Sequence, residues 1–96
     1  MFRQTFRIAA DHPALPGHFP GRPVVPGVVL LDRVAAAFEV WQNRPAMEWP
    51  QVKFLSPLLP EEEAVLTLEA GANAARFTIE RGAQIVATGT VSGAAS

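Results

Sequence analysis

A run of prolines and glycines directly before a long apolar segment constrains the fold of this chain more than any other feature. Residues 16–27 contain four prolines and three glycines. Proline removes a backbone N–H and fixes φ, so this run excludes a helix interior and a central strand. We therefore expect a loop of fixed shape here, with His18 inside it.

The segment after this loop predicts the main helix. Residues 28–41 are apolar at most positions, and Asp32 is the one acidic residue in the first half. Apolar side chains on almost every side predict a buried helix from about Pro26 to Trp41, with proline near its first position. The alternative is a strand over residues 24–31, followed by a shorter helix with Asp32 as its N-cap. Proline and glycine in the middle of that strand favour the longer helix.

The remaining segments predict an antiparallel sheet. We expect strands over residues 2–9, 48–55, 64–70, 74–81 and 84–92, because their apolar and polar residues alternate or are rich in strand-forming types. Short connections at residues 71–73 and 81–83 indicate hairpins, and the acidic run 61–63 is expected to be an exposed turn. The result is one α+β domain, residues 1–96, in which a curved sheet wraps one helix.

Composition limits the classes of partner. Hydrophobic residues make up 49% of the chain, which is apolar-rich for a small monomer, so we expect a second copy to join edge strand to edge strand and cover the helix. The net charge of −1 gives no basic stripe for nucleic acid, and the absence of cysteine excludes thiolate metal sites. No long apolar run or signal-peptide pattern occurs, so a cytoplasmic protein with no membrane contact is expected.

Two features of the central segment suggest chemistry. A carboxylate at Asp32 among apolar neighbours is costly to bury unless a partner such as His18 pairs with it. The backbone N–H groups at the helix start near Gly27, reinforced by the helix dipole, are suited to polarise a carbonyl oxygen.

These residues carry a resemblance to a known family. Residues 17–28 read GHFPGRPVVPGV, and Asp32 follows fourteen positions after His18. This stretch resembles the β-hydroxyacyl-acyl-carrier-protein dehydratases of the FabA/FabZ type, whose pattern is G-H-F-P-G-x-P-x-x-P-G-V with an acidic residue at that distance. Residues 52–54, with Pro57 and Pro60, are similar to the strand that follows the central helix in this family, so the likeness covers residues 5–92.

The resemblance implies a hot-dog fold and a dehydration without metal or cofactor. It implies that a 3-hydroxyacyl thioester, held on the phosphopantetheine of an acyl carrier protein, loses water to give a trans-2-enoyl thioester. By position, His18 is the base, Asp32 of the other subunit orients or protonates the hydroxyl, and the Gly27 N–H holds the thioester carbonyl. Val28 and Phe19 are implied to contact the substrate.

The chain departs from this family in three ways. Asp32 stands where many members have glutamate, which resembles the type that also isomerises the double bond. Ala36 replaces the usual glutamine one helical turn later, and the chain is shorter than typical members. Two alternatives stay open: an acyl-thioester hydrolase on the same fold, and a catalytically degenerate subunit that pairs with an active dehydratase.

Overall fold

The described part of the chain forms one helix and five strands, in the order that the sequence predicts. The computed structural model describes residues 1–13, 15 and 24–93. The elements are β1 (Phe2–Phe6), α1 (Gly27–Gln42), β2 (Ala46–Phe54), β3 (Ala64–Glu69), β4 (Ala75–Arg81) and β5 (Gln84–Gly93). β1 is three residues shorter than expected, because β3, its pairing partner, begins at Ala64 opposite Phe6.

The predicted long helix is confirmed, and the alternative strand over residues 24–31 is wrong. Pro26 has extended backbone angles, with φ −62° and ψ 146°, and stands directly before the first helical residue, Gly27. The helix ends where Asn43 adopts a left-handed conformation with φ 55°, and its N–H donates to the Glu39 carbonyl oxygen at 2.8 Å. This is an αL helix end, which asparagine tolerates better than most residues.

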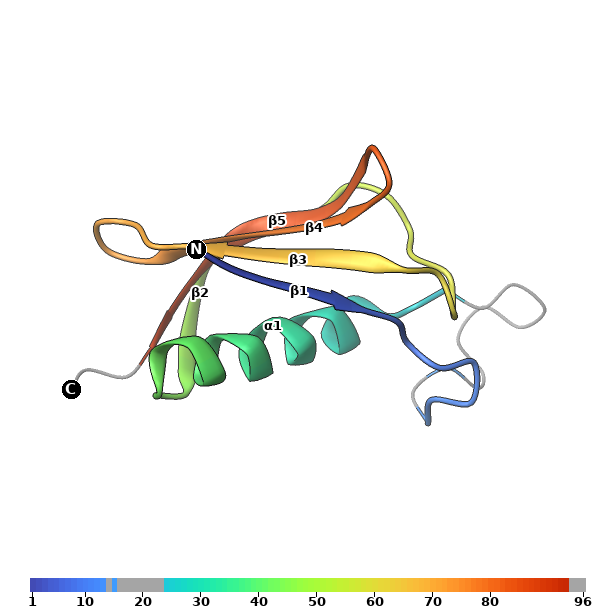
Figure 1. Cartoon of the computed structure of the whole chain (residues 1–96), viewed down its shortest axis with the longest axis horizontal. Coiled ribbons are helices and arrows are strands. Elements are labelled where there is room, and N and C mark those ends of the chain that lie inside the picture. Colours follow the sequence, from blue (N-terminus) through green and yellow to red (C-terminus); the bar gives the residue numbers. More distant parts are fainter. Residues whose placement is uncertain (14, 16–23, 94–96) are drawn as a thin grey trace.

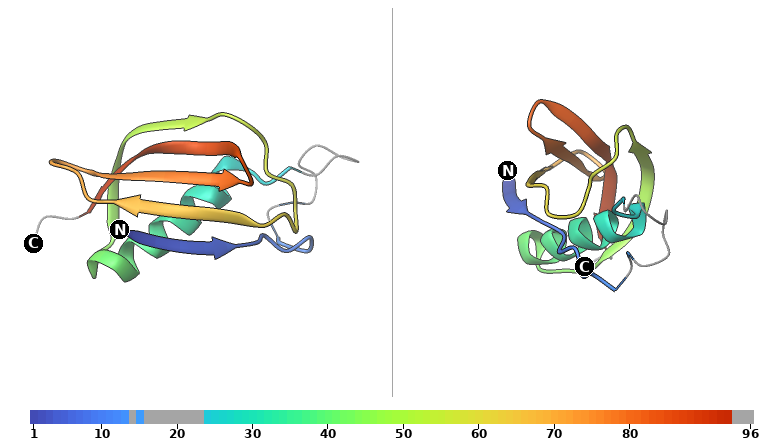
Figure 2. Two further views of the ribbon diagram at one scale, coloured as in Figure 1. Left: turned by 45° about the horizontal axis from the view of Figure 1, so that its top comes forward. Right: turned by 90° about the vertical axis from the view of Figure 1, so that its right-hand side faces the viewer.

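The five strands form one antiparallel sheet in the order β1-β3-β4-β5-β2. β3–β4 and β4–β5 are the two predicted hairpins, and β1 and β2 lie at the two edges of the sheet. The sheet curves over α1, which lies along its inner face (Figure 1). Seen along the long axis, the strands curl around the helix (Figure 2).

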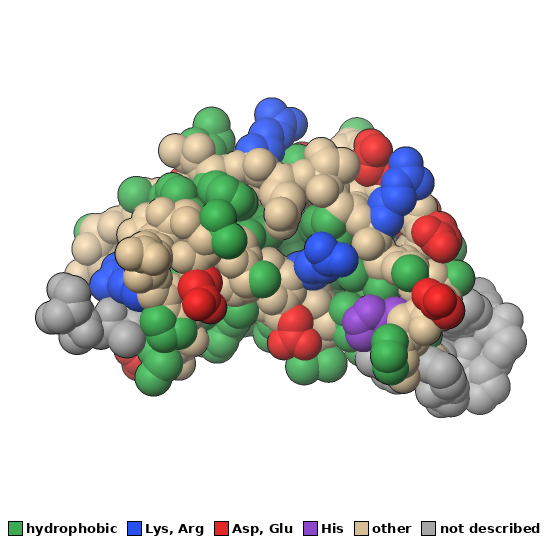
Figure 3. All heavy atoms as spheres, turned by 60° about the horizontal axis from the view of Figure 1, so that its bottom comes forward, with side chains coloured by type: hydrophobic (Ala, Val, Ile, Leu, Met, Phe, Trp, Pro, Cys, Tyr) green, Lys and Arg blue, Asp and Glu red, His purple; other side chains and the backbone are tan. Residues whose placement is uncertain are grey.

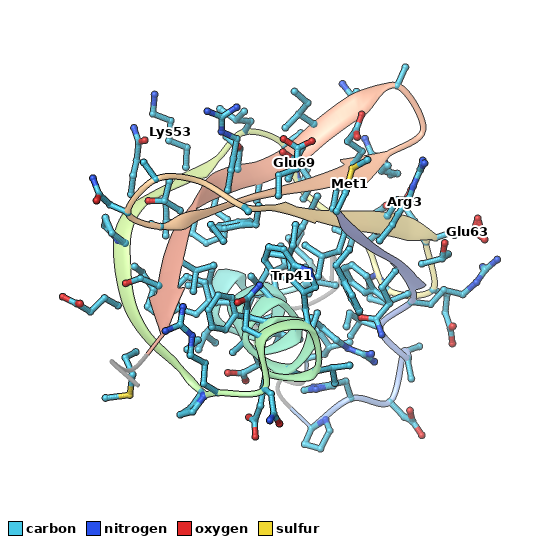
Figure 4. All side chains as sticks on the ribbon, turned by 60° about the vertical axis from the view of Figure 1, so that its left-hand side comes forward. Met1, Arg3, Trp41, Lys53, Glu63 and Glu69 are labelled. Carbon is cyan, nitrogen blue, oxygen red and sulfur yellow. The ribbon has the colours of Figure 1, made fainter. Side chains whose placement is uncertain are left out.

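The core lies between α1 and the inner face of the sheet. Alternate residues of β3 and β4 point inward and are buried, while the residues between them face outward. The largest fully buried side chains are Phe38, Phe77, Ile8, Leu58, Leu66, Leu68, Ile79, Val34, Val86 and Val91. Lys53, Glu69 and Arg3 lie on the outer side of the sheet, whereas Trp41 lies on the side of the helix (Figure 4).

A single chain buries only one side of α1, so the expected cover of the other side by a second copy stays a prediction. The buried residues of α1 are Val29, Leu30, Val34, Ala37 and Phe38. On the opposite side Val28 is 63% exposed and Val40 is 76% exposed, because one curved sheet covers only one side of a helix. Hydrophobic side chains therefore reach the surface between acidic and basic ones on the helix side of the molecule (Figure 3). No helix within the described ranges is long and apolar enough to span a bilayer.

Candidate active site

The N-terminus of α1 forms the centre of the candidate site. The N–H groups of Val29 and Leu30 donate to the Pro26 carbonyl oxygen at 3.0 and 3.4 Å. Among the described residues, no side chain caps this end of the helix. The first N–H groups of a helix have no acceptor within the helix, and the helix dipole makes this end electropositive. Gly27 is the first residue of this helix end, and the role of its N–H as a donor to a carbonyl oxygen stays a prediction.

Gly27 is in close contact with the aromatic ring at the end of β2. A Cβ atom built on Gly27 would lie 2.6 Å from Cζ of Phe54 and 3.0 Å from both Cε atoms. The ring therefore points tip-first at the glycine, and no larger residue fits at position 27 without moving it. Absence of a side chain allows this close approach.

A cavity of about 390 Å³ opens beside this contact. It is lined by Val24, Val25, Gly27, Leu30 and residues 54–58, so its walls are mainly apolar. This volume lies within the range of roughly 300–1,000 Å³ found for small-molecule sites. Because Gly27 belongs to the wall, a bound molecule can reach both the helix N-terminus and an apolar surface.

The loop over residues 55–63 holds the start of α1 in place, a role that the sequence did not reveal. The Val25 N–H donates to the carbonyl oxygen of Leu58 at 2.9 Å, and the Leu58 side chain is buried. The loop is tied to the sheet by Arg81, which donates to the Pro57 carbonyl oxygen at 2.9 Å and to Glu62 Oε1 at 3.1 Å. Arg81 also donates to the Gln84 side chain.

Glu62 completes this attachment and is not the freely exposed residue that we expected in the acidic turn. Its Oε1 accepts from the Leu59 N–H at 2.8 Å as well as from Arg81. The Leu59 N–H has the largest effect and lowers the pKa of Glu62 below its usual value of 4.5; burial opposes this, and the Arg81 guanidinium lowers the pKa further. Glu61 and Glu63 remain exposed, with Arg7 donating to the Glu61 carbonyl oxygen and pairing with Glu63 at 3.4 Å.

The structure places Asp32 on the open side of α1. Its side chain is exposed, as are Val28 and Ala36, which lie one helical turn before and after it. Val28 and Asp32 thus share one face of the helix, and Gly27 stands at the helix start. His18 and Phe19 lie outside the described residues, so their position relative to Asp32 stays a prediction. Within the described ranges, no group of three or more His, Cys, Asp or Glu side chains is arranged to hold a metal ion.

Comparison with known families decides where the chain belongs. The ApeI-like family, described as ApeI dehydratase, matches residues 2–90. The chain belongs to the ApeI-like family. The predicted relationship to dehydratases of the FabA/FabZ type is therefore confirmed.

Similar curated proteins are named FabZ. A 3-hydroxyacyl-[acyl-carrier-protein] dehydratase FabZ from Chloroflexus aggregans is 37% identical over 70 residues, covering 73% of this chain and 39% of the relative. The FabZ of Yersinia enterocolitica is 26% identical over 78 residues, covering 70% of this chain and 46% of the relative. This ApeI-like chain thus spans less than half the length of these relatives.

Solved structures confirm the hot-dog fold. The dehydratase heterocomplex ApeI:P from Xenorhabdus doucetiae contains a chain similar to this one, with a TM-score of 0.80 and 20% identity over 95% of this chain and 92% of that chain. A protein from Erwinia carotovora has a TM-score of 0.70 and 27% identity, over 93% of this chain and 78% of that chain. The fluoroacetyl-CoA-specific thioesterase FlK has a TM-score of 0.66 and 13% identity, over 95% of this chain and 85% of that chain. The ApeI and FlK likenesses show the fold alone.

Proposed function

We propose that this chain dehydrates 3-hydroxyacyl thioesters to trans-2-enoyl thioesters. The ApeI-like match over residues 2–90 supports this most strongly, and the curated relatives are named for this reaction. The geometry supports it independently, because the helix start at Gly27, which no described side chain caps, adjoins a largely apolar cavity. A thioester needs both: a donor for its carbonyl oxygen and an apolar surface for its acyl chain.

The proposed chemistry assigns one step to each residue. His18 removes the proton from C2, and the electron pair forms an enolate whose oxygen accepts from the Gly27 N–H. The C3–O bond then breaks as the electrons form the C2=C3 double bond. In its acid form Asp32 gives the hydroxyl group the proton with which it leaves as water; if Asp32 only orients the hydroxyl group, that proton is the one that His18 took from C2. Val28 and Phe19 contact the acyl group, and the mechanism uses no metal or redox cofactor.

We propose that the active unit is a homodimer joined along β2. The other edge strand, β1, presents the polar run Arg3-Gln4-Thr5, a pattern that discourages pairing with a further strand. On β2, in contrast, the apolar residue Met47 is 62% exposed. Val28 and Val40 of α1 are exposed as well. A second copy on this side buries these residues and adds its His18 to the site of Asp32.

The proposed substrate is carried on an acyl carrier protein, which the names of the FabZ relatives state for those proteins, and we propose that the phosphopantetheine of the carrier holds it. A second candidate follows from the Xenorhabdus structure, which is a heterocomplex. In that case this chain pairs with a different hot-dog subunit, and Ala36 in place of glutamine marks it as the less active partner. The thioesterase likeness at 13% identity does not favour hydrolysis.

One assay tests these functions together. The purified chain is incubated with 3-hydroxybutanoyl thioesters of pantetheine and of a carrier protein, while enoyl absorbance and free thiol are followed. We expect enoyl product that is lost in His18→Ala and in Asp32→Asn. Free thiol without enoyl product contradicts dehydration and identifies a hydrolase. No product from either substrate contradicts autonomous catalysis and favours the partner-subunit role.

A further inference from the structure

We propose that Phe54 sets the size of the acyl group that this site accepts, by contacting the first carbons beyond the thioester carbonyl. This inference rests on the proposed function, because it places the carbonyl oxygen at the Gly27 N–H. It adds a residue to which the mechanism above gives no role.

Phe54 faces the inner side of the sheet but is not buried there. Its cross-strand partner is Ala87, and the neighbouring pair Val52 and Gly89 faces the same side. Ala87 is fully buried, whereas Phe54 is 52% exposed. The cause is its position, since α1 begins at Gly27 and the ring lies at that end of the helix. The ring thus reaches the helix with its tip and leaves its sides open.

The open sides of the ring border the apolar cavity. Phe54 lines this cavity together with Val24, Leu30, Leu55 and Leu58. A half-exposed aromatic ring gains free energy when an apolar group covers it. An acyl chain is such a group, and the cavity wall offers it continuous apolar contact.

The contact with Gly27 fixes which part of the substrate meets the ring. C2, C3 and C4 of an acyl group are attached in sequence to the carbonyl carbon, at about 1.5 Å per bond. Because the Phe54 ring touches Gly27, an acyl group whose carbonyl accepts from the Gly27 N–H passes the ring within these first carbons. A smaller side chain at position 54 therefore makes room for longer or bulkier groups, and a larger one removes room.

The test is a size series at position 54. Phe54→Ala, Phe54→Leu and Phe54→Trp are compared with wild type for kcat/KM on 3-hydroxybutanoyl and 3-hydroxyoctanoyl pantetheine. We expect the C8-to-C4 ratio to rise about tenfold in Phe54→Ala, to rise less in Phe54→Leu and to fall in Phe54→Trp. Ile85→Ala is the matched control, because Ile85 is 43% exposed but does not line the cavity. It should leave the ratio unchanged.

A binding measurement separates this inference from the proposed function. Butanoyl and octanoyl pantetheine lack the 3-hydroxyl group and cannot be dehydrated, so their dissociation constants report the pocket alone. The same ordered shift in their ratio supports the role of Phe54 even if wild type forms no enoyl product. Unchanged ratios in all three variants overturn it. The proposal is also overturned if the ratio shifts only in variants that size-exclusion chromatography shows to have lost the assembly. That result would mean that a second copy, and not the acyl group, covers the Phe54 ring in the assembled protein.

Discussion

At the scale of single residues, Gly27 and Gly89 show that two glycines in tight surroundings respond differently to the same change. At Gly27 the three atoms nearest to an added Cβ all belong to the tip of the half-exposed Phe54 ring. At Gly89 it meets the backbone carbonyl oxygen of Gln51 on β2 and the ring of buried Phe77. A side chain can rotate away, whereas a strand backbone cannot move without breaking its pairing.

Gly27→Ala is therefore expected to change function more than stability. The Phe54 ring is displaced, so the free energy of unfolding changes by less than about 1 kcal/mol, while dehydration of the C4 substrate falls about tenfold or more. Thermal unfolding and initial rates measure both effects. Adding Phe54→Ala to Gly27→Ala removes the clash and should restore part of the rate. A double variant as slow as Gly27→Ala would show that the ring is not the cause.

Gly89→Ala is expected to destabilise the protein by about 2–4 kcal/mol, because β2 and β5 must separate locally to admit the methyl group. Urea unfolding followed by tryptophan fluorescence measures this, since Trp49 packs edge-on against Phe77 with ring centroids 6.0 Å apart. Gly82→Ala is a useful comparison, because nothing lies within 4 Å of its added Cβ. Its cost comes only from the positive φ of 58°. If Gly89→Ala and Gly82→Ala lower the free energy of unfolding equally, the packing argument at Gly89 is contradicted.

At the scale of elements, the loop over residues 55–63 links the sheet to the start of α1. Glu62 accepts from the Leu59 N–H and from Arg81, and its pKa is lowered below 4.5. A lowered pKa in the folded state means that the stabilisation is present above the unfolded pKa and is lost as the pH falls through the folded value. The loop should therefore be weakened by acid.

We expect Glu62→Gln to lower the melting temperature at neutral pH and to flatten its decline as the pH falls below about 4.5. Melting curves across this pH range measure the effect. Glu63→Gln is the matched control, since Glu63 forms only an exposed ion pair with Arg7, and such pairs contribute little. If the melting temperatures of Glu62→Gln and Glu63→Gln depend on pH in the same way, Glu62 does not stabilise the loop.

The elements also show which parts of the structure sequence reasoning can reach. Local signals were sufficient for the helix start, where Pro26 and Gly27 interrupt any strand, and for the β4–β5 hairpin, where Gly82 supplies a positive φ. They could not reveal the attachment of Arg81 to Pro57 and Glu62, because these contacts join segments that only the folded sheet brings together. The acidic run therefore looked like an ordinary exposed turn.

The candidate site was predictable to a similar extent. Gly27 stands at the helix start because local residue types determine that position, and its role as a donor stays a proposal. The place of Phe54 depends on where the end of β2 meets the start of α1, which no local pattern encodes. The apolar pattern of α1 predicted a covered helix, but it does not say which side the sheet covers and which side is left for a second subunit.

At the scale of the whole molecule, the exposed face of α1 and the free edge of β2 lead to the proposed dimer. Met47→Lys places a charge on β2 and leaves the residues His18 and Asp32 unaltered in the sequence. We expect it to shift the protein toward the monomer and to reduce dehydration in parallel, because each site then lacks residues from the second copy. Sedimentation and rate measurements test this. The corresponding change on β1, Thr5→Lys, should alter neither, and a dissociating effect there would mean that the other edge forms the interface.

The most direct test of the account mixes two inactive variants. If His18 of one copy acts with Asp32 of the other, a heterodimer of His18→Ala and Asp32→Asn contains one intact site and one doubly altered site. Random exchange then yields about one quarter of the wild-type rate, because about half of the dimers are mixed and each has one working site of two. A mixture that stays as inactive as its two parents, although the subunits demonstrably exchange, would contradict a catalytic site shared between copies.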